Sequence, residues 1–66
     1  MINIKCIKIF NPIAESSLVT ISKYIINNKI INNISINLSN ISDDDFYNFM
    51  DSVDFYTIKK LNLQKF

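Results

Sequence analysis

Apolar and polar positions in the first half of the chain follow two different periods. Residues 2–10 form a β-branched, apolar run that is typical of a strand. Asn11 and Pro12 follow it, and this pair is a common start of a helix. One helical face is marked by apolar residues at the helical spacing, namely Leu18, Ile21 and Ile25. The pattern predicts a strand over 2–10 and a helix from Pro12 to Asn27 or Asn28.

The clearest local signal lies in the second half of the chain. Ser42 and Asp45 have the spacing of a capping box, with Asp in place of the usual Glu, and Ile41 and Phe46 stand at the two hydrophobic-staple positions. These features predict a helix that begins at Asp43. Its apolar stripe comprises Phe46, Phe49, Met50 and Val53, and its wet side comprises Asp44, Tyr47, Asn48 and Asp51.

Two further segments have the alternation of strands. Apolar residues at 34, 36 and 38 alternate with Ser35 and Asn37, which predicts a strand over 31–38. Leu61 and Leu63 alternate in the same way and predict a third strand over 58–66. The order is therefore β-α-β-α-β, and its short connections predict an α/β fold with three parallel strands and right-handed crossovers.

An internal repeat runs through these elements. The spacing of Ile4, Ile7 and Ile9 recurs 27 residues later and again after another 27 residues, and the helical positions superpose at an offset of 28. The later copies are Ile31, Ile34 and Ile36, then Ile58, Leu61 and Leu63. The chain thus reads as a single domain, 1–66, with repeat units at 4–30, 31–57 and 58–66, the last incomplete.

A unit of this length with one strand and one helix resembles the ribonuclease-inhibitor-like class of leucine-rich repeat. The stretch 34–63 carries most of the resemblance. The resemblance implies that the strands stack in the order 1-2-3 with both helices on one face, and that the other face binds a protein. Carried onto this sequence, the implied partner-binding residues are Lys8, Phe10, Ser35, Asn37, Lys60, Asn62 and Gln64, with Asn33 beside them.

A second architecture competes with the repeat. Both sides of the 2–10 strand are apolar, as in a strand that is covered on both faces. This observation predicts an open α/β sheet of order 2-1-3. A STAS-like regulatory fold is one variant, since INLSNIS followed by a helix resembles the central strand and turn of that family. The strand order separates the two architectures.

The composition limits the chemistry available to these 66 residues. The chain has no His, Gly or Arg. Triads that use an imidazole base, His-containing metal sites and glycine-rich phosphate loops therefore cannot be built. Seven Lys against six acids leave no basic excess for nucleic acid. We expect a non-enzymatic protein with no cofactor, no metal and no nucleic-acid partner.

The lone cysteine and the length of the apolar runs bear on the compartment. Cys6 has no intramolecular disulfide partner, which is typical of a reducing environment, and its place in an apolar run predicts a buried thiol. No apolar stretch approaches the length of a membrane span. The sequence thus predicts a cytoplasmic protein that does not enter a membrane.

The charges predict a basic side and an opposite, acidic side of the molecule. The lysines at 5, 8, 59, 60 and 65 fall on the first and third strands, whereas helix 43–54 carries five acids and no Lys. Adjacent helical carboxylates point about 100° apart, so Asp43, Asp44 and Asp45 suit the helix N-terminus better than a metal ion.

Two functions remain open at this stage. The first is a protein–protein interaction module that uses the repeat-type sheet face. The alternative is a small inhibitor or regulator of a mobile element, acting through acidic helix 43–54. Because a core this small supplies little stability and both edge strands lack Pro, we also expect pairing of two copies into a homodimer.

Overall fold

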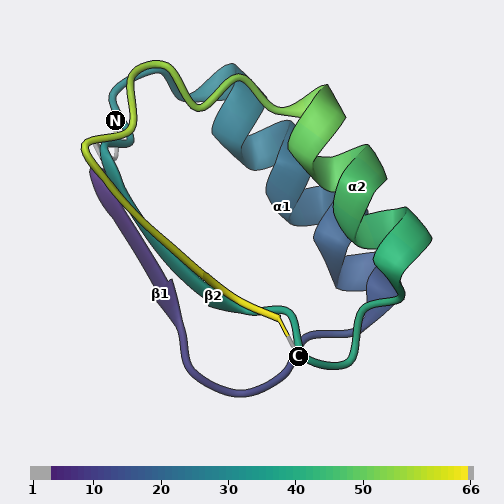
Figure 1. Cartoon of the computed structure of the whole chain (residues 1–66). Coiled ribbons are helices and arrows are strands. Elements are labelled where there is room, and N and C mark those ends of the chain that lie inside the picture. Colours follow the sequence, from purple (N-terminus) through teal and green to yellow (C-terminus); the bar gives the residue numbers. More distant parts are fainter. Residues whose placement is uncertain (1–3, 66) are drawn as a thin grey trace.

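Three strands alternate with two helices in the computed structural model, which describes residues 4–65 (Figure 1). In chain order the elements are β1 (Cys6–Ile9), α1 (Glu15–Asn27), β2 (Asn33–Asn37), α2 (Asp43–Ser52) and β3 (Lys60–Gln64). The predicted order of elements is confirmed, although each strand is shorter than predicted. The predicted strand positions at Ile2 and Phe66 lie outside the described residues.

The three strands form one parallel sheet in the order β1-β2-β3. Ile7 lies opposite Ile34, and Ile34 lies opposite Leu61, so that aligned residues are 27 positions apart on both sides of β2. The predicted strand order 1-2-3 is confirmed, and the alternative order 2-1-3 is wrong. Each short crossover returns the chain to the neighbouring position, which leaves β2 rather than β1 at the centre.

Both helices cover the same face of the sheet (Figure 1), as predicted. They begin 28 residues apart, α1 at Glu15 and α2 at Asp43, and they pack against each other. Between the helices and the sheet lies the apolar core: Ile13, Leu18, Ile25, Ile31, Ile34, Ile36, Leu38, Ile41, Phe49 and Val53. Within residues 4–65, neither helix has the length and apolar character that crossing a membrane requires.

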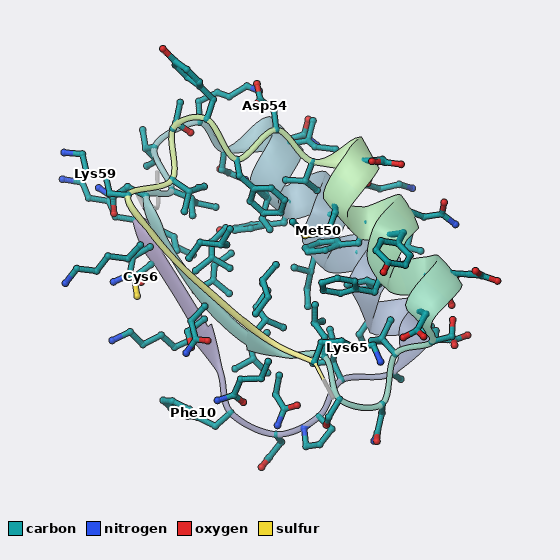
Figure 2. All side chains as sticks on the ribbon, viewed as in Figure 1. Cys6, Phe10, Met50, Asp54, Lys59 and Lys65 are labelled. Atoms are coloured by element: carbon teal, nitrogen blue, oxygen red, sulfur yellow. The ribbon has the colours of Figure 1, made fainter. Side chains whose placement is uncertain are left out.

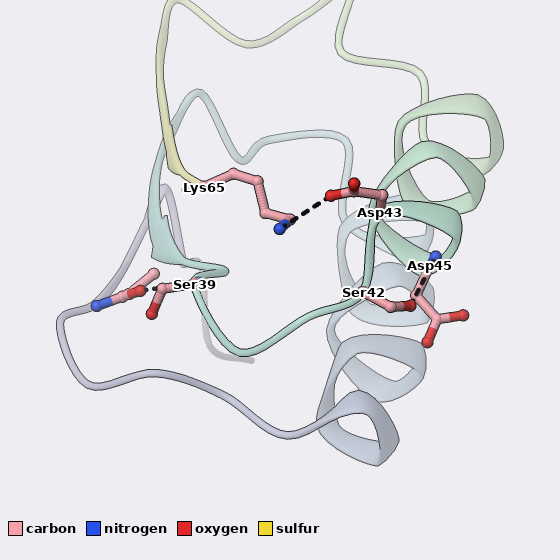
Figure 3. A network of polar contacts seen from close by, with 6 residues as sticks. Ser39, Ser42, Asp43, Asp45 and Lys65 are labelled. Carbon is pink, nitrogen blue, oxygen red and sulfur yellow. Dashed lines mark hydrogen bonds and ion pairs between the residues drawn. The ribbon is translucent and has the colours of Figure 1, made fainter.

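Helix α2 begins where the capping signal predicts. The Ser42 Oγ accepts a hydrogen bond from the backbone N–H of Asp45 at 3.3 Å (Figure 3), which satisfies one of the free donors of the first turn. Phe49 is buried, Phe46 and Met50 are half-buried against the core, and Tyr47 on the opposite side is exposed. The predicted apolar stripe is therefore confirmed.

Helix α1 begins later than predicted. We expected Asn11 as the N-cap and Pro12 as the first helical residue, but the N-cap is Ala14, which makes no side-chain capping bond. The reason is tertiary. The backbone N–H of Ile13 donates to the Asn37 carbonyl at 3.3 Å, and the Ile13 side chain is buried, so this segment stays with the sheet before the helix starts.

Because β2 is the central strand, the same substitution should lower the free energy of unfolding more in β2 than in β1. Ile34 on β2 is fully buried, whereas the aligned Ile7 on β1 is half-buried. We expect Ile34→Val to lower the free energy of unfolding by about 1 kcal/mol and Ile7→Val by less than half of that. Urea denaturation midpoints measure both. A larger effect at Ile7 would place β1 at the centre and contradict the strand order.

The α2 cap gives a second stability prediction. Ser42→Ala removes the acceptor of the Asp45 N–H and should cost about 1 kcal/mol. Asp44→Asn is the control, because the exposed Asp44 side chain forms no hydrogen bond or ion pair within residues 4–65, and its exposed charge stabilises the first turn less than the cap does. Denaturant midpoints of the two variants should differ clearly. Equal midpoints would mean that the Ser42 hydroxyl does not stabilise the helix.

Candidate binding face of the sheet

Within residues 4–65, both helices lie on one face of the sheet and no helix covers the other, which we call the outer face (Figure 1). Its side chains alternate along each strand with the apolar residues that enter the core. The parallel register arranges them in rows across the strands. The outer face comprises Cys6, Lys8 and Phe10 from β1 and the residue after it, Asn33, Ser35 and Asn37 from β2, and Lys60, Asn62 and Gln64 from β3.

All seven residues predicted to bind a partner lie on this outer face. Lys8, Ser35 and Asn62 form one row across the three strands, and Asn37 and Gln64 are aligned in the next. Lys60 is aligned with Asn33, the neighbour named with them. Phe10 follows β1, and its side chain points away from the helices with 77% of its surface exposed (Figure 2). The seven predicted residues therefore lie on one surface.

Cys6 was predicted to be buried, and this prediction is wrong. The thiol is exposed, and its side chain lies on the outer side of β1 (Figure 2). The cause is strand parity, because Cys6 precedes the inward-facing Ile7 and is aligned with the polar Asn33. Because residues on both sides of the 2–10 strand are apolar, the run itself does not show which side faces the core. The polar residues found 27 and 54 positions later, Asn33 and Lys60, were the signal that could have revealed it.

Asn37 combines an outer-face position with a structural role. Its side-chain amide donates to the Phe10 carbonyl at 3.0 Å, and its Oδ1 accepts from the backbone N–H of Ser39 at 3.0 Å (Figure 3). The side chain therefore links the end of β1 to the turn after β2. Sequence reasoning assigned Asn37 to partner binding alone and missed these bonds, which depend on the parallel alignment of the two strands.

The charges are divided between the two layers. Lys8 and Lys60 are exposed on the outer face, and Lys5 and Lys59 directly precede β1 and β3. The acids lie on the helices or just after α2: Glu15, Asp43, Asp44, Asp45, Asp51 and Asp54. Lys65, which was predicted to join the basic side, instead turns to α2. Lys23 on α1 and Lys29 just after it are the other two lysines of the chain. All six acids lie on the helix side, and four of the seven lysines lie on the sheet side.

Two of the α2-side acids have partners within the chain. Among residues 4–65 the one ion pair joins the Lys65 Nζ to an Asp43 carboxylate oxygen at 3.1 Å (Figure 3). Asp54 Oδ1 accepts from the backbone N–H of Tyr56 at 2.9 Å. No three Cys, Asp or Glu side chains of the described residues gather in a way that could hold a metal ion. The acidic run thus serves the start of α2 and its contact with the end of β3.

No family model, curated protein or solved structure matches this chain. The resemblance to leucine-rich repeats therefore stays a prediction, and function is inferred from the surface itself. On that surface, strands hold polar, basic and aromatic side chains at regular spacings of about 4.8 Å across the sheet. Such an arrangement can hydrogen-bond and attract a partner.

The two hydrogen bonds of the Asn37 side chain predict that its loss lowers stability more than the loss of the aligned Gln64 side chain. Asn37→Ala removes the contacts to Phe10 and Ser39 and should lower the free energy of unfolding by about 1 kcal/mol. Gln64→Ala, at the equivalent exposed position of β3, should change it by less than about 0.5 kcal/mol. Thermal or urea denaturation checks both. If the two costs were equal, the Asn37 bonds would contribute nothing.

Proposed function

We propose that this protein is a non-enzymatic protein-interaction module that binds its partner with the outer face of the sheet. The observation that carries the proposal is the one-sided cover of the sheet. Both helices pack on the inner face, and the outer face stays open over residues 4–65 (Figure 1). Half-buried and exposed polar residues, two exposed lysines and a largely exposed aromatic ring share this surface.

The repeat supports the same proposal. Aligned residues on all three strands are 27 positions apart, and the helices stay on one side. This is the arrangement that the resemblance to leucine-rich repeats implies, and repeat proteins of this kind bind partners on extended concave surfaces. The outer face corresponds to that surface.

The alternative, an inhibitor that acts through acidic helix 43–54, has less support. Asp43 is engaged by Lys65, and Asp54 accepts a backbone hydrogen bond. Asp43, Asp44 and Asp45 also occupy the first turn, where carboxylates stabilise the helix itself. These acids have roles within the fold. Lys8 and Lys60 on the outer face, in contrast, form no ion pair within residues 4–65.

A capture experiment with matched variants tests the proposal. The full chain is immobilised and exposed to a lysate of the organism that makes it, and bound proteins are compared between the wild type and two variants. Ser35→Glu adds bulk and negative charge at the centre of the outer face. Thr20→Glu makes a comparable change at an exposed position on α1. We expect Ser35→Glu to lose the partner, with the signal falling about tenfold, and Thr20→Glu to retain it.

A third variant examines the acidic helix. Asp51→Lys reverses an exposed charge on α2, at a position outside its first turn. Loss of the partner with Asp51→Lys or Thr20→Glu, and retention with Ser35→Glu, would overturn the proposal and move the interface to the helices. Circular dichroism of each variant confirms that a loss of capture does not come from unfolding.

A further inference from the structure

The middle strand presents short polar groups on the outer face, with a lysine on either side. Asn33 and Ser35 project from β2, together with Asn37, whose side chain also bonds to Phe10 and Ser39. Lys8 on β1 lies beside Ser35, and Lys60 on β3 lies beside Asn33. Hydroxyl and amide groups can both donate and accept hydrogen bonds, as the backbone of an extended peptide requires. A partner backbone that follows β2 would therefore find hydrogen-bonding groups below it and positive charge on both sides.

The outer face also carries positive charge without a matching acid. Lys8 and Lys60 are exposed, and the ion pair present among residues 4–65 uses neither of them. Lys5 and Lys59 add charge at the starts of the outer strands, and Lys59 lies at the sheet side of the molecule, far from α2 (Figure 2). Since the acidic side chains lie on or just after the helices, no Asp or Glu of residues 4–65 lies on the outer face to neutralise these lysines.

We propose that the ligand of the outer face is an acidic segment of another protein, bound in extended conformation along β2. This inference rests on the proposed function and specifies its partner. Carboxylates of the segment pair with Lys8 and Lys60, and its backbone contacts the row of short polar side chains on β2. An apolar side chain of the segment packs against Phe10 at the end of β1, where the ring is 77% exposed.

The spacing of the two lysines fits such a segment. Lys60 lies in the row of Cys6, which is two residues before Lys8, so the two lysines are offset by about 6.6 Å along the strand direction of this parallel sheet. In an extended peptide above β2, the side chains that face the sheet recur every second residue, at nearly the same spacing. Lys8 can therefore reach one such carboxylate from one side of β2, and Lys60 can reach the next from the other side.

A polypeptide fits this face better than a nucleic acid does. The chain contains no Arg, the residue that binds phosphate with two parallel hydrogen bonds. Phe10 is the one aromatic side chain in the set that forms the outer face, whereas single-stranded nucleic acids are held by successive stacking platforms. The amide and hydroxyl groups of β2 are instead suited to backbone N–H and C=O groups.

Fluorescence anisotropy with a defined probe tests the inference. The probe is a short fluorescein-labelled peptide in which Glu alternates with Ser and a Leu lies near one end. We expect saturable binding that weakens as salt is raised, because exposed charges are screened. Lys8→Glu and Lys60→Glu should each weaken binding about tenfold. Lys23→Glu, an identical charge change on exposed α1, should change it less than about twofold.

Two further probes test the charge preference with the wild type as well, so that the result does not depend on the folding of a variant. A peptide with Lys in place of Glu should not bind the wild type but should bind the variant that carries both Lys8→Glu and Lys60→Glu. An oligothymidylate of matched charge should bind more weakly than the acidic peptide. Tighter binding of the oligonucleotide, or equal losses in the Lys8 and Lys23 variants, would overturn the inference.

Cys6 provides an internal reporter of where the peptide binds. It is the one cysteine of the chain, it is exposed, and it lies on the outer face. Saturating acidic peptide should slow the reaction of this thiol with a disulfide reagent, and the Lys peptide should not. If the acidic peptide fails to bind while partner capture still depends on Ser35, the charge inference fails and the proposed function stands. If capture is also independent of Ser35, both fail.

Discussion

The 27-residue register of three parallel strands is the constraint on which the rest of this structure depends. Each unit returns the backbone to the neighbouring strand position, so that Ile7, Ile34 and Leu61 face the same layer. The backbone hydrogen bonds of β2 are then satisfied on both sides, and its inward side chains are fully buried. A shift of one residue would turn the core side chains of a strand outward, so burial of Ile34 and Ile36 holds the alignment in place.

One-sided packing follows from this constraint. The two crossovers join adjacent parallel strands, and both of their helices lie on the same face, where they enclose the core with the sheet (Figure 1). On every strand, the side chains that alternate with the core residues point away from the helices. They include amides, a hydroxyl, two lysines and a thiol, while the acids lie with the helices. The electrostatic polarity of the molecule is thus a consequence of strand parity, and it underlies the proposal that the outer face binds an acidic segment.

Much of the fold and the membership of the candidate face could be predicted from local patterns. The start of α2 depends on Ser42 and Asp45, which are three residues apart and interact through one hydrogen bond within the turn. The spacing of the apolar positions predicted which residues align across the strands, because a parallel sheet with equal repeats must align them. The competing order 2-1-3 could not be dismissed in the same way, since the apolar run 2–10 is compatible with a strand covered on both faces.

The sequence by itself determined the order of the elements, the period and, apart from Cys6, the residues of the outer face, since these depend on spacing and on contacts within one turn. Only the tertiary structure decided where α1 begins, because the bond from Ile13 to Asn37 joins segments that are distant along the chain. It also decided that Cys6 is exposed, that Asn37 links two strand ends, and that Lys65 pairs with Asp43. Each of these depends on which strand lies beside which, and that choice is made by burial of the common core.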